Sequence, residues 1–336
     1  MGESAQVKIG RRVFLRCAGS ASVCTLAAGC AGLPFTGSES YSVAILGDTH
    51  FDAEPASVYH SKYDDSNPWS KVQRSEFRRN GEMWRFRCRD LLGASGMVAR
   101  RRRTDFVLQL GDLIQGDCDD AQTHVKMLRD CINLFRSRYP AGIPLLTVAG
   151  NHDYRGKNAR DAYFGFIEPY LFGELGVAVQ YPAFSFRRGP DCWVFCNFES
   201  RDLKSIRMLI ESAADARHVF LVTHGPFTAS DTNSWKWRLG GSDECAEERK
   251  RLYETLSRRH AIVLSGHTHT VAWFRHENKF GSFCEFTANS VWADPLQASA
   301  VPIFSKPEDY GRRSEAKFKG EALADFRRDL DFFRPG

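Results

Sequence analysis

Five short apolar runs in this chain each end in a cluster of polar residues, and this repeated pattern constrains the fold more than any other feature. The runs have the length and the β-branched content of strands. They are Ser42–Leu46 before Gly47-Asp48-Thr49-His50, Phe106–Leu110 before Gly111-Asp112, Ile143–Ala149 before Gly150-Asn151-His152-Asp153, Val219–Val222 before Thr223-His224, and Ala261–Leu264 before Ser265-Gly266-His267-Thr268-His269. The sequence therefore predicts five strands, each followed by a polar loop.

Longer stretches with helical spacing separate these runs, at residues 82–101, 121–137, 202–215 and 244–259. Strands that alternate with helices predict an α/β fold with a mostly parallel sheet. Ligands of such sheets bind at the carboxyl ends of the strands, so the five clusters are expected at one edge. A predicted hairpin of Phe184–Arg187 and Cys192–Phe198 indicates a mixed sheet or a second sheet.

The charge of the chain argues against nucleic acid as a partner. The formal net charge is +5, but residues 1–29 carry four basic side chains and one acidic one. The remainder, with 42 basic and 40 acidic side chains, is nearly neutral. Nucleic-acid binding usually needs a clear basic surface. No feature of the sequence indicates a protein partner.

The first 30 residues have the features of an export signal. Arg11 and Arg12 precede an uncharged run, residues 17–29, that is too short and too polar to span a membrane. The paired arginines resemble a bacterial twin-arginine signal, and the residues before Cys30 resemble a lipoprotein processing site. Two interpretations stay open at Cys30, namely a lipid anchor or simple cleavage. Both predict an exported bacterial protein, in the periplasm or attached to the envelope.

The ten cysteines give no metal signal, because the sequence contains no CxxC pair. Cys192 and Cys196 lie on one face of a predicted strand and are interpreted as core residues. Seven cysteines follow Cys30, and an odd number excludes complete pairing within one chain.

The polar clusters, taken in order, read Asp-x-His, Gly-Asp, Gly-Asn-His-Asp, His and Gly-His-x-His. In this order they resemble the motifs of the calcineurin-like metallophosphoesterases over roughly residues 41–290. The resemblance implies a four-layer αββα sandwich with two mixed β-sheets, of the metallo-dependent phosphatase type. It also implies hydrolysis of a phosphate ester by a hydroxide that bridges two metal ions. Residues 31–40 are then a linker, residues 41–290 the catalytic domain, and residues 291–336 an extension that ends in a helix at 313–333.

The same resemblance assigns a role to each polar residue. Seven residues are implied as metal ligands: Asp48, His50 and His269 for the first ion, Asn151, His224 and His267 for the second, and Asp112 as the bridge. His152 is implied to assist the leaving group without binding metal, and Asp153 to orient His152 by accepting its other ring proton. Gln115 stands where the family often has a second acid or a tyrosine, which disfavours the purple acid phosphatases.

The chemistry explains why these residue types are needed. Phosphate esters hydrolyse very slowly in water, and a pair of metal ions acidifies water and neutralises charge on the phosphoryl group. One carboxylate between the ions offsets their repulsion, while neutral imidazole and amide ligands leave the site positive for an anionic substrate. Nitrogen and oxygen ligands without thiolate suit two divalent or trivalent ions, with Mn, Fe or Zn favoured.

Two long segments beside these clusters, residues 55–80 and 228–247, are candidates for the substrate pocket. They contain His60, Trp235 and Trp237, and their aromatic and basic residues suit a small phosphorylated ligand. An equal alternative is that the tryptophans only anchor the loops. Whether the substrate is a monoester or a diester stays open. So do two other functions: a nuclease of the same superfamily, and a non-catalytic surface protein that binds metal or ligand.

Any one cluster alone could be an ordinary turn after a strand. Five such turns in this order are far less expected by chance, which favours the metal site. The remaining histidines of this part of the chain lack such context and are predicted to be surface or packed residues: His124, His218, His260 and His276.

Overall fold

The computed structural model describes residues 40–53, 66–67, 70–71, 74, 81, 84, 88–227, 238–269 and 272–291. The predicted export signal with Cys30, most of the linker and the helix at 313–333 lie outside the described residues. His60, Trp235 and Trp237 lie outside them as well. None of the described helices is long and apolar enough to cross a bilayer.

The described helices and strands alternate along most of the chain, as expected for an α/β fold. In chain order they are β1 (Val43–Leu46), α2 (Arg89–Arg102), β2 (Phe106–Gln109), α3 (Ala121–Arg138), β3 (Leu145–Thr147), the short 3-10 helix η3 (His152–Tyr154), α4 (Ala159–Leu175), β4 (Ala183–Arg188), β5 (Asp191–Cys196), α5 (Leu203–Ser212), β6 (Val219–Val222), the 3-10 helix η4 (Asp243–Cys245), α7 (Ala246–Arg258), β7 (Ile262–Ser265), β8 (Ala272–Asn278) and β9 (Gly281–Thr287).

The smaller sheet has the order β1-β2-β3 and is wholly parallel in the part of the chain that the structure describes. The expectation of two mixed sheets is therefore wrong for this one. The physical reason is the connections: α2 lies between β1 and β2, and α3 between β2 and β3. A helical crossover returns the chain so that the next strand runs in the same direction.

The larger sheet is mixed, with the order β4-β5-β6-β7-β9-β8. The predicted hairpin is present as the antiparallel pair β4 and β5. A second hairpin, β8 and β9, is absent from the sequence prediction. Its inward positions include His276 and Glu285, which are buried although their residue types suggest exposure. These two polar residues obscure the alternation of apolar and polar positions by which a half-buried strand is identified.

Helix α4 is the other element that the sequence prediction lacks. Gly165, Pro169 and Gly173 interrupt its helical propensity. The helix forms because Tyr163, Ile167 and Leu171, spaced four residues apart, are buried on one face. This face packs beside α3 and β3.

The two faces of β5 show how the four layers arise. Alternate side chains of a strand point to opposite faces. Trp193 and Phe195 face the smaller sheet, and the Trp193 ring centroid lies 5.2 Å from that of Phe106 in β2. Cys192 and Cys196 instead pack in a second core with α5 and α7. All seven cysteines of the described residues are free thiols.

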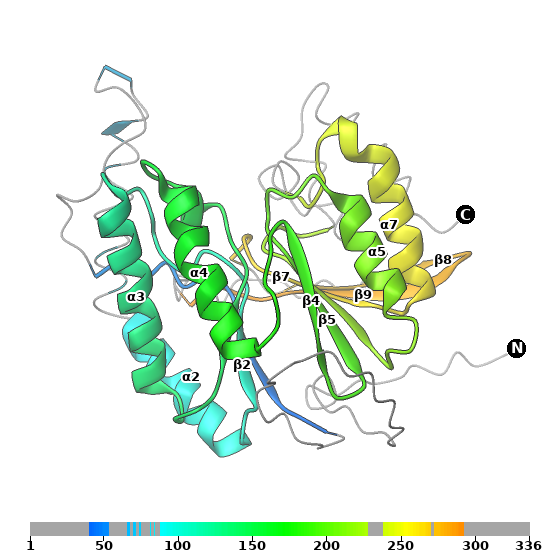
Figure 1. The fold of residues 1–336 in the computed structure, drawn as a ribbon, viewed down its shortest axis with the longest axis horizontal. Helices are drawn as coiled ribbons and strands as arrows, with labels where there is room; N and C mark the ends of the chain where they lie inside the picture. The colour runs from blue at the N-terminus through cyan, green and yellow to red at the C-terminus, as the bar shows by residue number, and fades with distance from the viewer. Residues whose placement is uncertain are drawn as a thin grey trace, which may run out of the picture.

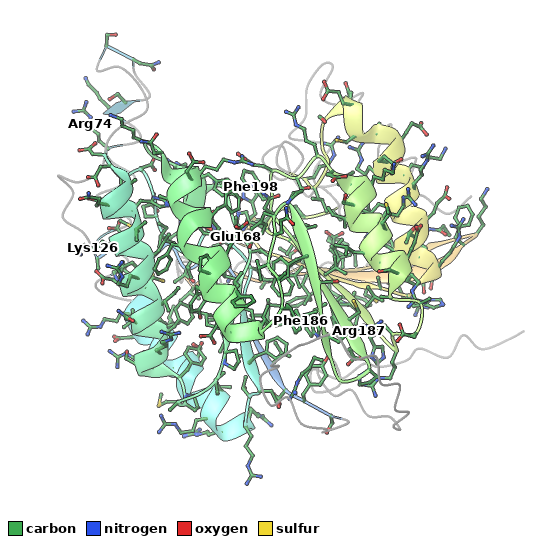
Figure 2. All side chains as sticks on the ribbon, viewed as in Figure 1. Arg74, Lys126, Glu168, Phe186, Arg187 and Phe198 are labelled. Atoms are coloured by element: carbon green, nitrogen blue, oxygen red, sulfur yellow. The ribbon has the colours of Figure 1, made fainter. Side chains whose placement is uncertain are left out.

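The predicted αββα order is confirmed. Figure 1 shows α2, α3 and α4 on the outer side of the smaller sheet, and α5 and α7 on the outer side of the larger one. Figure 2 shows Phe186 of β4 between the two halves, where its ring belongs to the core that the sheets share. The two sheets therefore face each other across aromatic side chains.

Polar contacts join the two sheets where their parallel strands begin. The Tyr41 hydroxyl, just before β1, donates to Asp191 Oδ2 at the start of β5 over 2.7 Å. Arg188 at the end of β4 donates from Nη2 to Oδ1 of Asp105, the residue before β2, over 2.7 Å. These two contacts hold together the end of the sheets at which the parallel strands begin. The loops with the candidate metal ligands follow the opposite end.

Candidate metal centre

The loops that follow β1, β2, β3, β6 and β7 meet at one edge of the two sheets, as predicted. Backbone hydrogen bonds join them directly. His50 donates its N–H to Asp112 O over 2.9 Å, and Gly266 donates its N–H to His224 O over 3.0 Å. The expected residues are thereby brought together from segments far apart in the sequence.

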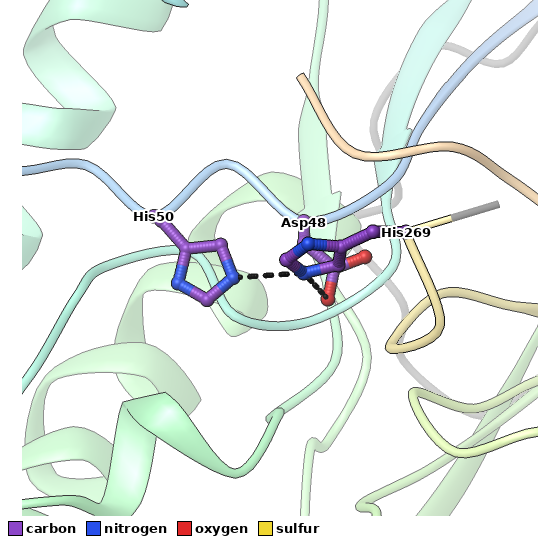
Figure 3. Close-up of side chains that lie close together, drawn as sticks. All are labelled: Asp48, His50 and His269. Carbon is purple, nitrogen blue, oxygen red and sulfur yellow. Dashed lines mark hydrogen bonds and ion pairs between the residues drawn. The ribbon is translucent and has the colours of Figure 1, made fainter. Parts of the chain in front are cut away.

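The first ligand group consists of Asp48, His50 and His269, whose candidate ligand atoms all lie within 4.8 Å of one another. Nε2 of His50 lies 3.1 Å from Nε2 of His269, and the latter lies 3.6 Å from Asp48 Oδ1 (Figure 3). Asp48 is fully buried, whereas the side chain of His269 is 24% exposed. The first ligand group therefore has a buried carboxylate and one imidazole, that of His269, that is partly exposed to solvent.

The second ligand group consists of Asp112, His224 and His267, also within 4.8 Å of one another. His224 Nε2 lies 3.3 Å from Asp112 Oδ2 and 3.1 Å from His267 Nδ1. The side-chain oxygen of Asn151 is 3.2 Å from the same Nε2. All four residues therefore converge on one point, with His224 at the centre.

Asp112 lies between the groups. Its Oδ2 is 3.6 Å from His50 Nε2 in the first group and 3.3 Å from His224 Nε2 in the second. Its Oδ1 accepts the backbone N–H of His152 over 2.7 Å. One carboxylate oxygen therefore faces both groups, which is the position that a bridging ligand requires.

Hydrogen bonds behind the site fix two of these side chains. His224 Nδ1 lies 2.7 Å from Leu110 O and donates to it, which directs Nε2 into the site. Both carboxylate oxygens of Asp48 lie 3.0 Å from the backbone N–H of His267. The orientation of the two groups is thus set by the backbone.

The backbone is strained at four of the candidate ligands. His50, Asp112, His267 and His269 have φ angles of 45°, 52°, 66° and 52°. Residues other than glycine rarely adopt this left-handed region, at a cost of about 1–3 kcal/mol each. Arg103, Asp117, Asn158 and His260 share this conformation, so the strain supports the site only because four of its residues gather at one edge.

Two glycines permit the close approach of the loops. Gly111 has a φ of 88°, and a Cβ atom there would lie 2.5 Å from Nδ1 of His224. A Cβ atom on Gly150 would collide with the carboxylate of Asp112. These two glycines are therefore points of close backbone approach.

The electrostatics of the site suit cations. Burial lowers the pKa of His50 and of His267 to about 4, so both imidazoles are neutral near pH 7 and have a lone pair for a metal. Burial would also lower the pKa of His224, but the carboxylates of Asp112 and Asp48 raise it to about 9. Two buried carboxylates and several neutral imidazoles are a donor set that fits a pair of metal ions.

The expected contact between His152 and Asp153 is wrong. His152 Nδ1 lies 3.0 Å from Gln115 O, to which it donates. The Asp153 carboxylate instead accepts the backbone N–H groups of Gly150, over 2.8 Å, and Ile114, over 3.2 Å. Burial and the Asp112 charge raise the pKa of Asp153 to about 7. Asp153 therefore shapes the ligand loops rather than the imidazole.

His152 satisfies the distance criterion for a third group with His50 and Asp112. Its ring nitrogens are already engaged, however, because Nδ1 faces Gln115 O and Nε2 lies 2.7 Å from Nη1 of Arg155. A guanidinium at that distance repels a metal ion. The implied role of His152 as a residue that binds no metal stays a prediction.

Arg155 is a site residue that the sequence analysis missed. The spacing of Arg155 from His152 in the sequence is a weak indication of this position. In the 3-10 turn of η3, side chains three residues apart lie above one another, and Arg155 is the cation three residues after His152. None of the four histidines without motif context belongs to either ligand group. His124 and His276 are buried, His218 is half-buried and His260 is exposed.

Comparison with known proteins yields one family. A family model for the calcineurin-like phosphoesterases matches residues 41–271, more than half of the chain. No curated protein matches the sequence significantly.

Solved structures with a similar fold are distant in sequence. A dimetal phosphatase from Danio rerio has 14% identity and a TM-score of 0.45, and the match covers 76% of this chain and 90% of that one. GAP50, the anchor in the inner membrane complex of Plasmodium, has 14% identity and a TM-score of 0.41, over 74% of this chain and 71% of that one. PhoD has 10% identity and a TM-score of 0.44, over 75% of this chain and 56% of that one.

Proposed function

The chain belongs to the calcineurin-like phosphoesterase family, and from that premise we propose that it hydrolyses a small phosphate ester outside the cytoplasm with two metal ions. Family membership supports a phosphoric ester hydrolase, and together with the two ligand groups it supports a dinuclear metal centre. The ligand assignment is our proposal: Asp48, His50 and His269 hold one ion, Asn151, His224 and His267 hold the other, and Asp112 contacts both. Mn, Fe and Zn suit these ligands.

The observation that carries the proposal is the position of Asp112. Its buried Oδ2 faces an imidazole of each ligand group, at 3.6 and 3.3 Å. Burial alone would raise the pKa of Asp112, but the charge of His224 lowers it well below its usual value. A permanently ionised carboxylate at the midpoint supports a pair of cations better than it supports one.

The bound ions would supply an acidified water and positive charge for the phosphoryl oxygens. The protein supplies the geometry around them. The bond from the His152 N–H to Asp112 Oδ1 holds the His152 ring beside the first group, with its centroid 4.4 Å from that of His50. We propose that His152 assists the departure of the leaving oxygen from this position.

The test is hydrolysis of p-nitrophenyl phosphate and of bis-p-nitrophenyl phosphate by the purified protein, with manganese and with a chelator. We expect turnover that requires the metal, and the ratio of the two rates distinguishes monoesterase from diesterase activity. Absence of turnover on both substrates, with two metal ions bound per chain, would instead favour the non-catalytic alternative. The nearly neutral charge after residue 29 gives the nuclease alternative no support.

We also propose that residues 1–30 direct export through their paired arginines. Replacement of Arg11 and Arg12 by lysine should retain the protein in the cytoplasm on cell fractionation. Cys30→Ser separates the two interpretations of that residue: it should release a lipid-anchored protein from the membrane fraction, and leave a simply cleaved one unaffected. Export that is unchanged by the double lysine variant would contradict the twin-arginine assignment.

A further inference from the structure

Arg155 lies beside His152 at the edge of the candidate metal centre. Its Nη2 forms an ion pair of 2.7 Å with Asp117 Oδ2, and its Nη1 lies 2.7 Å from His152 Nε2 and 3.0 Å from His152 Nδ1. The side chain of Asp117 is 3% exposed, whereas that of Arg155 is 20% exposed. The guanidinium is therefore anchored by a buried carboxylate, while part of the Arg155 side chain remains accessible.

Two backbone hydrogen bonds also hold Arg155 in place. Its N–H donates to His152 O over 3.0 Å, and its carbonyl accepts the N–H of Asp117 over 2.6 Å. The next residue, Gly156, forms a β-bridge with Cys118. A charge fixed in this way loses little side-chain freedom when it binds an anion, which is the condition for preorganised electrostatic stabilisation.

On the side away from Asp117, Arg155 faces His152, which is a weak hydrogen-bond acceptor. His152 Nδ1 donates to Gln115 O, so Nε2 offers only the lone pair of a neutral ring to Nη1. A phosphoryl oxygen carries negative charge and accepts more strongly from guanidinium, often through two N–H groups. An ester bound at the ligand groups would bring such an oxygen near the guanidinium, because Nη1 of Arg155 lies 2.7 Å from His152 Nε2 and the His152 ring contacts that of His50, with centroids 4.4 Å apart.

We infer that Arg155 binds a non-bridging phosphoryl oxygen and makes the site selective for terminal phosphoryl groups, that is, for phosphomonoesters over diesters. The inference rests on the proposed function. A monoester carries two negative charges near neutral pH and a diester carries one, so a fixed cation contributes more to binding the monoester. Asp117, on the far side of the guanidinium, keeps this cation in place.

The test compares Arg155→Met and Arg155→Lys with the wild type in the full-length, manganese-loaded protein. We expect Arg155→Met to lower kcat/KM for p-nitrophenyl phosphate by roughly 10- to 100-fold, as for loss of one charge-assisted contact, and for bis-p-nitrophenyl phosphate by less than about 5-fold. Arg155→Lys keeps the charge without the planar fork and should recover part of the monoester rate. Arg160→Met removes the same charge from an arginine that pairs with Glu199 on the surface, and should change neither rate.

A second readout does not need turnover. Calorimetry should show that inorganic phosphate binds manganese-loaded Arg155→Met roughly tenfold more weakly than the wild type. Equal losses on both esters, or unchanged phosphate affinity, would overturn the inference and assign Arg155 to structure alone. If the wild type turned over neither ester while Arg155→Met lost phosphate affinity, the proposed function would fail and the role of Arg155 as an anion-binding residue would stand.

Discussion

The two halves of the molecule contribute different chemistry to one site. The half built on β1, β2 and β3 supplies both carboxylates and the amide: Asp48, Asp112 and Asn151. The half built on the larger sheet supplies only imidazoles: His224, His267 and His269. All the negative charge of the candidate ligands thus lies on one side. On the proposed assignment, the smaller half supplies the charge that attracts cations, and the larger half adds imidazole ligands.

Asp112→Asn should have the largest effect, because it removes charge from the half that supplies it. We expect activity to fall by about 10³-fold or more, and metal binding to weaken by more than about 100-fold. The amide has nearly the same shape and can still accept the His152 N–H, so the fold should persist. Metal content and p-nitrophenyl phosphate turnover check this prediction. Wild-type activity in this variant would contradict the assignment of Asp112 as the bridge.

His267→Ala should have a smaller effect, because it removes a neutral ligand from the other half. We expect roughly 10- to 100-fold weaker binding of one metal ion. Excess manganese should restore part of the activity, whereas Asp112→Asn should not respond to it. His260→Asn is the matched control. His260 is exposed and has a left-handed backbone conformation, as His267 has, so this variant should behave as the wild type. If manganese rescues both site variants alike, the division between the halves is wrong.

Asp191→Asn tests the opposite end of the sheets. The buried carboxylate accepts bonds from Tyr41, Arg217 and His218, at 2.7 to 3.2 Å. Removal of its charge should lower the free energy of unfolding by about 2–3 kcal/mol, while kcat per folded molecule stays unchanged. Denaturant unfolding measures the first quantity and the ester assay the second. Asp215→Asn, in the exposed ion pair with Arg187, should leave stability unchanged.

His124 of α3 should produce a smaller, pH-dependent effect within the smaller half. Burial lowers the pKa of His124 to about 4. Between pH 6.5 and 4 the unfolded chain binds a proton here that the folded protein does not, so stability present above pH 6.5 is lost as the pH falls. The loss should reach about 1–2 kcal/mol by pH 5. Unfolding curves of His124→Leu and the wild type should therefore diverge below pH 6.5, and parallel curves would contradict the prediction.

The sequence is informative where one physical signal dominates. The runs before Asp48 and Asp112 are short, apolar and β-branched, so their strands and their common edge could be predicted. Hairpin β8–β9 and helix α4 could not, because their formation depends on tertiary contacts that bury His276 and Glu285 and override Gly165 and Pro169. The hydrogen-bond partners of Asp153 could not be predicted from the sequence either. An acid next to a histidine in sequence indicates proximity, but the turn of η3 decides which groups its carboxylate meets.

The separation of the ligands along the chain bears on how the protein acquires its metal. His50 and His269 contact each other across 219 residues of sequence. Contacts of such range form late in folding, since the entropy of closing a long loop is lost before the contact is gained. The ligand set is complete only after residue 269 has been synthesised and both sheets have formed. On the proposed ligand assignment, metal capture is therefore a late step in the maturation of this protein, and the ions available in the compartment where folding ends would decide which metal it carries.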